Sequence, residues 1–237
     1  MGIQKQKDIF LQGEGNHWYD RARQQVDGAN KCFAYQQILN FVPAFRDSTS
    51  ILEIGCSSGN KLDFLAHGRP GQFYGIDPSA KAIEDGKNKF ERLNLFVGTA
   101  DNLPFEDAFF DLIIFGFCLY LCDREDLFKI AAETDRCLKK NGFLAIIDFF
   151  SCVPYSNTYK HADHVFSYKM NYANLFLWHP SYSLVSQIPF SHSSYSFNDK
   201  VDERVALQVL YKDSVENVIP CDIYCEKMSG RTGGYEK

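Results

Sequence analysis

Apolar and polar positions follow one another along the chain in blocks that have the length of single strands and helices. Short, continuous apolar runs predict buried strands at residues 50–54, 72–76, 93–98, 109–116 and 142–150. Glycine, proline and serine punctuate the segments between them, which predicts helices over residues 57–68, 78–90 and 124–140. Strands that alternate with helices and are apolar on both faces are typical of a parallel sheet covered by helices on each side. The pattern therefore predicts a doubly wound, Rossmann-like α/β fold.

The two ends of the chain depart from this alternation. Residues 1–47 have the pattern of amphipathic helices, and Pro43 ends them. After residue 150 the pattern predicts one helix and then two strands, at 165–177, 182–190 and 202–212. The two strands are expected to form an antiparallel hairpin at the edge of the sheet. The predicted fold is then built on a seven-stranded, mostly parallel sheet with an antiparallel C-terminal hairpin.

Composition narrows the class of protein. The chain has 237 residues, 45% of them hydrophobic, which suits one large domain with a sizeable core. Its net charge of −5 provides no overall attraction for nucleic acid. No apolar run reaches the ~20 residues that cross a bilayer, and the N-terminus lacks the apolar region of a signal peptide. These features predict a cytoplasmic protein.

The eight cysteines do not form a recognisable framework. Their spacing is irregular, and no Cys-x-x-Cys pair occurs. Cys56, Cys118 and Cys137 lie in apolar or motif contexts, where a reduced cysteine behaves as a small hydrophobic residue. A disulfide framework and a structural zinc site are therefore not expected.

The stretch ILEIGCSSGN, residues 51–60, runs from a strand through a glycine-bearing turn into a helix. Glycine there lets the backbone approach a ligand, and the helix N-terminus offers unpaired N–H groups. Asp77 ends the next strand, where a carboxylate can accept hydrogen bonds from both hydroxyls of an adenosine ribose. The turn therefore predicts a site for a cofactor that contains a nucleoside.

Two classes of cofactor use such a turn. A dinucleotide requires Gly-x-Gly-x-x-Gly, but Ser57 and Asn60 occupy two of the three glycine positions. The carboxylate of Glu53 would also repel a pyrophosphate. S-adenosylmethionine fits better, because its methionine end is zwitterionic and its sulfonium is positive, so that an acidic residue at the turn is tolerated.

Four stretches support this choice: LEIGCSSGN, YGIDPSAKAIEDG, GTADNLPFEDAFFDLIIF and LKKNGFLAI. In this order, within about residues 45–150, they resemble the class I S-adenosylmethionine-dependent methyltransferases. The resemblance implies that Glu53, Gly55, Ser57 and Gly59 frame the methionine part of the cofactor. The family usually has glycine where this chain has Ser57, and a serine is expected to fit there with a negative φ.

The resemblance also implies roles further along the chain. Asp77, followed by Pro78, would hold the ribose hydroxyls. Asp101, followed by Asn102 and Leu103, would accept a hydrogen bond from the adenine amino group.

Two aromatic stretches would lie near the reacting end of the cofactor. Phe117, in FGFCLY after the fourth strand, would pass close to the sulfonium. GNHWYDRAR, near the N-terminus, resembles the start of some sugar-modifying members, in which a helix covers the cofactor as a lid. Trp18 would then stack on the bound ligand and Arg21 would pair with the methionine carboxylate. Alternatively, Trp18 packs on the sheet and Arg21 is a solvated helix charge.

The segment YKHADHVFSYKMNY, residues 159–172, follows the fifth strand and is rich in aromatic residues and histidine. In this fold ligand groups gather beyond the carboxyl ends of the strands, so the segment is expected to form the wall of an acceptor pocket. For an alcohol acceptor, His161 or His164 could remove the proton, and Tyr168 could contact the acceptor. A metal site at HADH would need further ligands, and none is indicated.

The expected organisation is a helical lid at 1–47, a methyltransferase domain at 48–228 with an acceptor-binding insertion at about 151–180, and a disordered tail at 229–237. A weaker resemblance of the C-terminal part to methyltransferases found with bacterial surface-polysaccharide genes favours O-methylation of a sugar or nucleotide-sugar. The alternatives are N-methylation of a small amine or an RNA base, and a non-catalytic methyltransferase-like binding module. The sequence does not indicate the oligomeric state.

Overall fold

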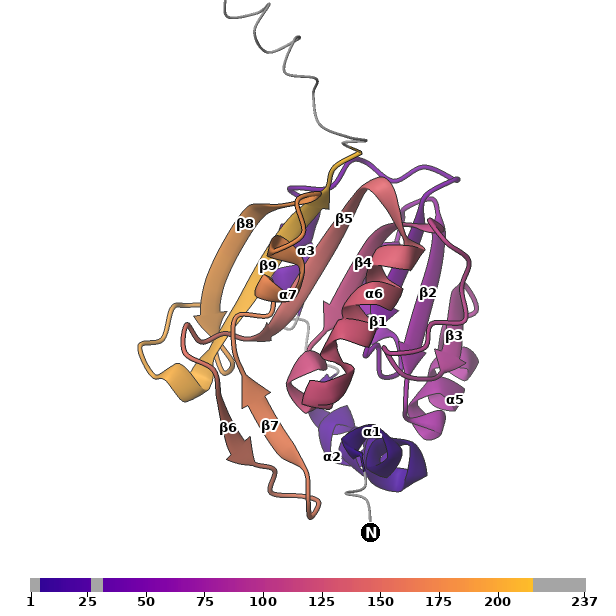
Figure 1. The fold of residues 1–237 in the computed structure, drawn as a ribbon. Coiled ribbons are helices and arrows are strands. Elements are labelled where there is room, and N and C mark those ends of the chain that lie inside the picture. The colour runs from indigo at the N-terminus through magenta and orange to yellow at the C-terminus, as the bar shows by residue number, and fades with distance from the viewer. Residues whose placement is uncertain (1–4, 27–31, 215–237) are drawn as a thin grey trace, which may run out of the picture.

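The computed structural model describes residues 5–26 and 32–214. The tail expected to be disordered, 229–237, lies outside these residues. One seven-stranded sheet runs through the molecule in the order β3-β2-β1-β4-β5-β9-β8 (Figure 1). Its strands are β1 Ser50–Ile54, β2 Gln72–Asp77, β3 Leu93–Val97, β4 Phe110–Gly116, β5 Leu138–Phe149, β8 Tyr182–Ser191 and β9 Arg204–Lys212. The first five pair in parallel, while β9 is antiparallel to both β5 and β8. The predicted fold class is confirmed.

Helices cover both faces of the sheet and create two hydrophobic cores. One core lies under α6 Leu127–Cys137 and α7 Asn174–Leu177. The other lies under α3 Phe33–Ile38, α4 Asn60–Ala66 and α5 Ala80–Lys89. Apolar residues of the central strands are buried on both faces, since every residue of β1 is buried. This explains why these strands have continuous apolar sequences.

The N-terminal segment consists of α1 Gln6–Ile9, the π-helical turn η1 Phe10–Glu14 and α2 Gly15–Val26. Figure 1 shows α1 and α2 at the end of the sheet where the parallel strands finish. The segment is fastened to the loop after β4, because the Lys5 ammonium lies 2.7 Å from the Asp126 carboxylate and the Gln6 N–H donates to Asp123. Among the described residues, no helix is long and apolar enough to cross a membrane.

Two sequence-based boundaries were wrong. The helix expected over 165–177 is mostly absent, since residues Phe166–Lys169 form strand β7 and only Asn174–Leu177 form α7. Strand β7 pairs with β6, Tyr155–Thr158, in a two-stranded hairpin. Aromatic residues at alternate positions favour a strand over a helix. The helix expected over 124–140 ends at Cys137, because Leu138 already pairs with Phe110 in the sheet.

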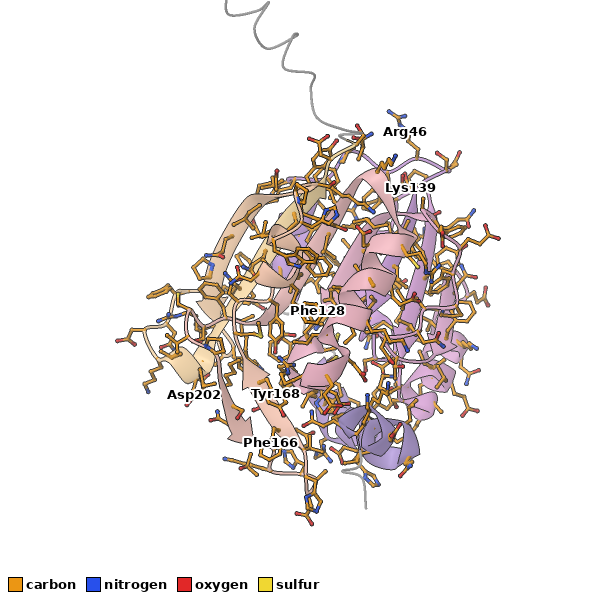
Figure 2. All side chains as sticks on the ribbon, viewed as in Figure 1. Arg46, Phe128, Lys139, Phe166, Tyr168 and Asp202 are labelled. Carbon is orange, nitrogen blue, oxygen red and sulfur yellow. The ribbon has the colours of Figure 1, made fainter. Side chains whose placement is uncertain are left out.

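The β6–β7 hairpin is fastened to the sheet by a buried lysine. A two-stranded hairpin alone is marginally stable in water. Lys169 of β7 donates to the backbone oxygen of Asp202, 2.7 Å away, and to its carboxylate, 3.0 Å away. Asp202 belongs to the 3₁₀ turn η5 Val201–Glu203, which leads into β9. Figure 2 labels Tyr168 on β7 and Asp202 next to the hairpin.

Candidate active site

The carboxyl ends of β1, β2 and β4 surround a cavity with about 860 Å³ of empty space, its open mouth included. The strand ends contribute Gly55, Asp77, Asp101 and Phe117 to its walls. The N-terminal segment covers it with Lys7, Phe10, Gly15 and Trp18. A cavity at this edge of a doubly wound sheet is the usual position of a ligand site.

The turn after β1 brings the backbone close to the cavity. Gly55 and Gly59 have φ of +76° and +82°, values that favour glycine. A Cβ atom at Gly55 would lie 2.6 Å from the Cβ of Cys118, so no larger residue fits there. Ser57 has φ +52°, which contradicts the expected negative value. Its N–H donates to a carboxylate oxygen of Asp77 at 2.8 Å, and this bond compensates for the strained backbone.

Asp77 connects two turns and also faces the cavity. Its second carboxylate oxygen accepts a hydrogen bond from the N–H of Ser79 at 2.9 Å. Burial raises the pKa of Asp77 to about 6, although both backbone hydrogen bonds favour the charged form. Pro78 lines the cavity beside it. Both residues expected to hold the ribose therefore line the cavity.

Glu53 lies behind the cavity, directly behind Gly116. It is 1% exposed, and it accepts a hydrogen bond from the hydroxyl of Tyr35 on α3. Burial raises the pKa of Glu53 to about 7, while Lys61 and the Tyr35 hydrogen bond lower it. Within the described residues, Oε2 of Glu53 and Oγ of Ser57 are buried and have no hydrogen-bond partner. Glu53, Ser57 and Gly59 do not themselves line the cavity, whose wall here is formed by Ile54 and Gly55.

Asp101 occupies the side of the cavity expected for adenine. It is 5% exposed, and its carboxylate contacts the Lys7 ammonium at 2.6 Å and the Thr99 hydroxyl at 2.7 Å. Burial would raise the pKa of Asp101, but these groups outweigh it and lower the pKa to about 2. Asn102 and Leu103, expected beside it, do not line the cavity. Leu103 is buried instead, and its N–H donates to Glu133.

The N-terminal segment supplies residues that the sequence did not single out. Lys7 lies between two carboxylates, 2.6 Å from Asp101 and 2.8 Å from Asp126. Trp18 lines the cavity, as expected for a lid residue. Arg21 does not line it, because its guanidinium pairs with Glu14 and donates to the Tyr159 hydroxyl. A run of Lys, Gln and Lys at 5–7 gives no local signal of this placement, since the partners lie more than 90 residues away.

Phe117 marks the boundary between the cavity and an aromatic cluster. Its backbone has φ +67°, and its N–H donates to the carbonyl of Ile147. Its ring lies 5.0 Å from the rings of both Tyr120 and Phe149. A cluster of packed aromatic rings, with Tyr120 buried in it, therefore connects the cavity wall with the end of β5.

The structure does not bring the three predicted acceptor-side residues to the cavity. His161 and His164 are exposed in the turn between β6 and β7, and His164 has φ +61°. Tyr168 of β7 is half-buried under the guanidinium of Arg124, which lies 4.2 Å from its ring. The β6–β7 hairpin still reaches the site indirectly, because Tyr159 donates to Glu14 of the N-terminal segment at 2.9 Å.

Comparison with known proteins agrees with the geometry. Residues 52–146 match the family model described as a methyltransferase domain. An uncharacterized methyltransferase of Schizosaccharomyces pombe is 31% identical over 109 residues, which are 46% of this chain and 42% of that protein. A demethylmenaquinone methyltransferase of Staphylococcus aureus is 34% identical over 108 residues, 44% of each chain. The chain thus spans less than half the length of these curated relatives.

Solved structures share the fold at low sequence identity. One of them is a 1,6-didemethyltoxoflavin-N1-methyltransferase of Burkholderia thailandensis, which was solved with S-adenosylhomocysteine. It superposes with a TM-score of 0.67 at 14% sequence identity, and the match covers 87% of this chain and 88% of that one. A SAM-dependent methyltransferase of Methanosarcina mazei superposes with a TM-score of 0.61 at 17% sequence identity, and the match covers 76% of this chain and 98% of that one. The family model matches residues 52–146, and the fold of the described residues is that of solved S-adenosylmethionine-dependent methyltransferases. The expected family and its cofactor, S-adenosylmethionine, are confirmed.

Proposed function

We propose that the chain transfers a methyl group from S-adenosylmethionine to a hydroxyl of a small molecule. The observation that carries the proposal is one cavity that joins the glycine turn, Asp77 and Asp101 under the N-terminal segment. When bound, the cofactor supplies a methyl group that its sulfonium has already activated. The protein then has to hold the cofactor, align the acceptor and exclude water.

The residues around the cavity fit the parts of the cofactor. Asp77 suits the ribose hydroxyls, since a carboxylate accepts two such bonds. Asp101 suits the adenine amino group, although Lys7 already shares this carboxylate. The unpartnered Oε2 of Glu53 and Oγ of Ser57 suit the ammonium and carboxylate of the methionine end. The N-terminal segment, with Phe10 and Trp18 above the cavity, excludes water.

We propose a sugar or nucleotide-sugar hydroxyl as the acceptor, in a bacterial surface-polysaccharide context. The aromatic rings of Phe117 and Trp18 in the cavity wall support this proposal, because the apolar face of a sugar ring packs on aromatic rings. Two of the similar proteins are named for demethylmenaquinone and for 1,6-didemethyltoxoflavin, both small molecules. The acidic net charge of −5 gives no support to an RNA acceptor.

Calorimetry with S-adenosylmethionine and S-adenosylhomocysteine tests the first half of the proposal. Both are expected to bind with dissociation constants in the micromolar range. Binding of neither below millimolar concentration would contradict the proposed function.

A panel of acceptors tests the second half. Release of S-adenosylhomocysteine would be measured with monosaccharides, nucleotide-sugars, phenols and primary amines. Turnover with hydroxyl compounds is expected. Turnover with amines alone would contradict O-methylation, and tight cofactor binding without turnover on any compound would favour a non-catalytic binding module.

A further inference from the structure

Among the described residues, two lysines contact the carboxylate of Asp101, but only one of them lines the cavity. The ammonium of Lys7 lies 2.6 Å from Oδ2 of Asp101, and that of Lys129 lies 3.3 Å from the same oxygen. Lys7 and Asp101 both belong to the cavity wall, whereas Lys129 does not. The side chain of Lys129 is 59% exposed, against 25% for Lys7. Lys7 is therefore the cation that a ligand bound to Asp101 meets.

Contacts with the loop after β4 hold Lys7 in the cavity wall. Its ammonium also lies 2.8 Å from the Asp126 carboxylate, and its backbone N–H donates to Asp123 at 3.1 Å. The neighbouring Lys5 pairs with Asp126 as well, at 2.7 Å. These contacts fix both the backbone and the side chain of Lys7. A donor that is already fixed loses little conformational entropy when a ligand binds to it.

The Lys7 ammonium has one hydrogen-bond donor left for a ligand. An ammonium group carries three N–H donors and no acceptor. Within the part of the chain that the structure describes, the carboxylates of Asp101 and Asp126 take two of these donors. Burial would lower the pKa of Lys7, but the two carboxylates outweigh it and raise the pKa above its ordinary value, so the group is charged at neutral pH. The third donor suits an acceptor atom inside the cavity.

The chemistry of adenine matches a carboxylate that has an ammonium beside it. Oδ1 of Asp101 accepts the Thr99 hydroxyl at 2.7 Å, which leaves this oxygen a second lone pair for the adenine amino group. The amino group is a donor, and the ring nitrogens N1 and N7 that flank it are acceptors. Because Lys7 contacts the other oxygen of the same carboxylate, an adenine bound to Asp101 brings one of these nitrogens within reach of Lys7.

We propose that Lys7 determines specificity for the adenine of the cofactor; the inference rests on the proposed function. Asp101 accepts the adenine amino group, and the third N–H of Lys7 donates to the ring nitrogen beside it, N1 or N7. The two side chains together recognise a donor and an acceptor that lie next to each other. Hypoxanthine and guanine lack this combination, since they carry a carbonyl oxygen in place of the amino group.

The first experiment compares S-adenosylhomocysteine with two analogues in which a C–H group replaces N1 or N7 of the adenine. Dissociation constants for the parent protein are measured by calorimetry. At least one analogue is expected to bind about 10- to 100-fold more weakly than S-adenosylhomocysteine, because it cannot accept the charged N–H of Lys7. Equal binding of all three ligands would overturn the inference alone, whereas failure of S-adenosylhomocysteine itself to bind would overturn the proposed function and the inference with it.

The second experiment assigns this loss of affinity to Lys7. In Lys7→Met, the ratio of the two dissociation constants, analogue over S-adenosylhomocysteine, is expected to fall to about one, because the donor is absent. The ratio is measured within one variant, so a looser N-terminal segment changes both constants alike. Ligand-observed NMR extends the comparison to millimolar dissociation constants.

Lys129→Met is the matched control, since it removes a cation from Asp101 but none from the cavity wall. It should keep the ratio of the parent protein. A parent-like ratio in Lys7→Met would contradict the proposed bond. An equal fall of the ratio in both variants would overturn it too, because the charge around Asp101, rather than a donor on Lys7, would then set the ratio.

Discussion

At the scale of single residues, Asp77 combines a structural and a ligand-binding task. Its carboxylate accepts the N–H groups of Ser57 and Ser79, and it also faces the cavity. Burial raises its pKa to about 6, so near that pH it is only partly ionised without a ligand. Two ribose hydroxyls that donate to this carboxylate would favour its charged form.

Cofactor binding should therefore release protons near pH 6. Calorimetry at pH 6 in buffers of different ionisation enthalpy measures this release, which should vanish at pH 8, where Asp77 is already charged. Asp77→Asn is expected to abolish the part due to Asp77 and to weaken binding by about 10- to 100-fold, since charge-assisted hydrogen bonds contribute about 1.5–3 kcal/mol. Glu84→Gln, on the exposed side of α5, is the control. An undiminished affinity in Asp77→Asn would exclude the ribose assignment.

Residues that follow a strand directly could be placed from the sequence, and others could not. Gly55, Asp77 and Phe117 line the cavity because each lies at the end of its own parallel strand. Lys7 reaches Asp101 only after the N-terminal segment folds over strands that come much later in the chain. Such long-range pairing leaves no local trace in the sequence.

At the scale of elements, the side chain of Gln6 joins three segments. It is 4% exposed on α1. Its amide donates to the carbonyls of Leu121 and Phe166, at 2.8 and 3.2 Å, and accepts the N–H of Phe166 at 2.7 Å. Leu121, in the 3₁₀ turn η3 Leu119–Leu121, lines the cavity, and Phe166 begins β7. The Gln6 side chain therefore joins the N-terminal segment to the start of β7, in addition to the contacts of Glu14 and Arg21 with Tyr159.

Gln6→Ala should loosen the lid and the hairpin together. The substitution leaves the N–H of Phe166 and the carbonyl of Leu121 without their partner, at a cost of about 1–3 kcal/mol each. Hydrogen exchange is expected to become faster in both α1 and β7, and affinity for S-adenosylmethionine should fall by about tenfold. Gln36→Ala, at an exposed site on α3, should change neither. Faster exchange in α1 alone would show that the hairpin is fixed independently, through Lys169 and Asp202.

The same segments explain which elements were predictable. The central strands β1 and β4 have apolar runs typical of buried strands, and all seven strands of the main sheet were predicted, including the partly exposed β3 and β8. The β6–β7 hairpin is mostly exposed, so its sequence carries no such pattern. The hairpin is held instead by polar side-chain contacts, which include those of Lys169 with Asp202 and of Gln6 with Phe166. The alternation of Phe166 and Tyr168 is a sign of a strand, but it extends over only the four residues of β7.

At the scale of the whole molecule, the sheet contains a carboxyl group that costs stability when it is charged. Glu53 is 1% exposed in the central strand β1, and burial raises its pKa to about 7. An unfolded glutamate ionises near pH 4.5, so between these values the folded protein binds the proton more tightly. The contribution of protonated Glu53 to the free energy of unfolding is complete below about pH 4.5 and is lost as the pH rises through 7. Without ligand, this group should therefore make the protein less stable at pH 8 than at pH 5.

Glu53→Gln tests whether the charged carboxylate of Glu53, which lowers stability at high pH, contributes to cofactor binding. The amide keeps an oxygen that can accept the Tyr35 hydrogen bond but cannot ionise. The variant should match the parent in thermal unfolding at pH 5 and unfold at a higher temperature at pH 8, since no charge is then buried. Its affinity for S-adenosylmethionine at pH 8 should nevertheless be lower, because the unpartnered Oε2 no longer offers a charge to the methionine ammonium. A variant that is less stable than the parent at pH 8 would show that the ionised carboxylate stabilises the fold, whereas unchanged affinity would place the ammonium elsewhere.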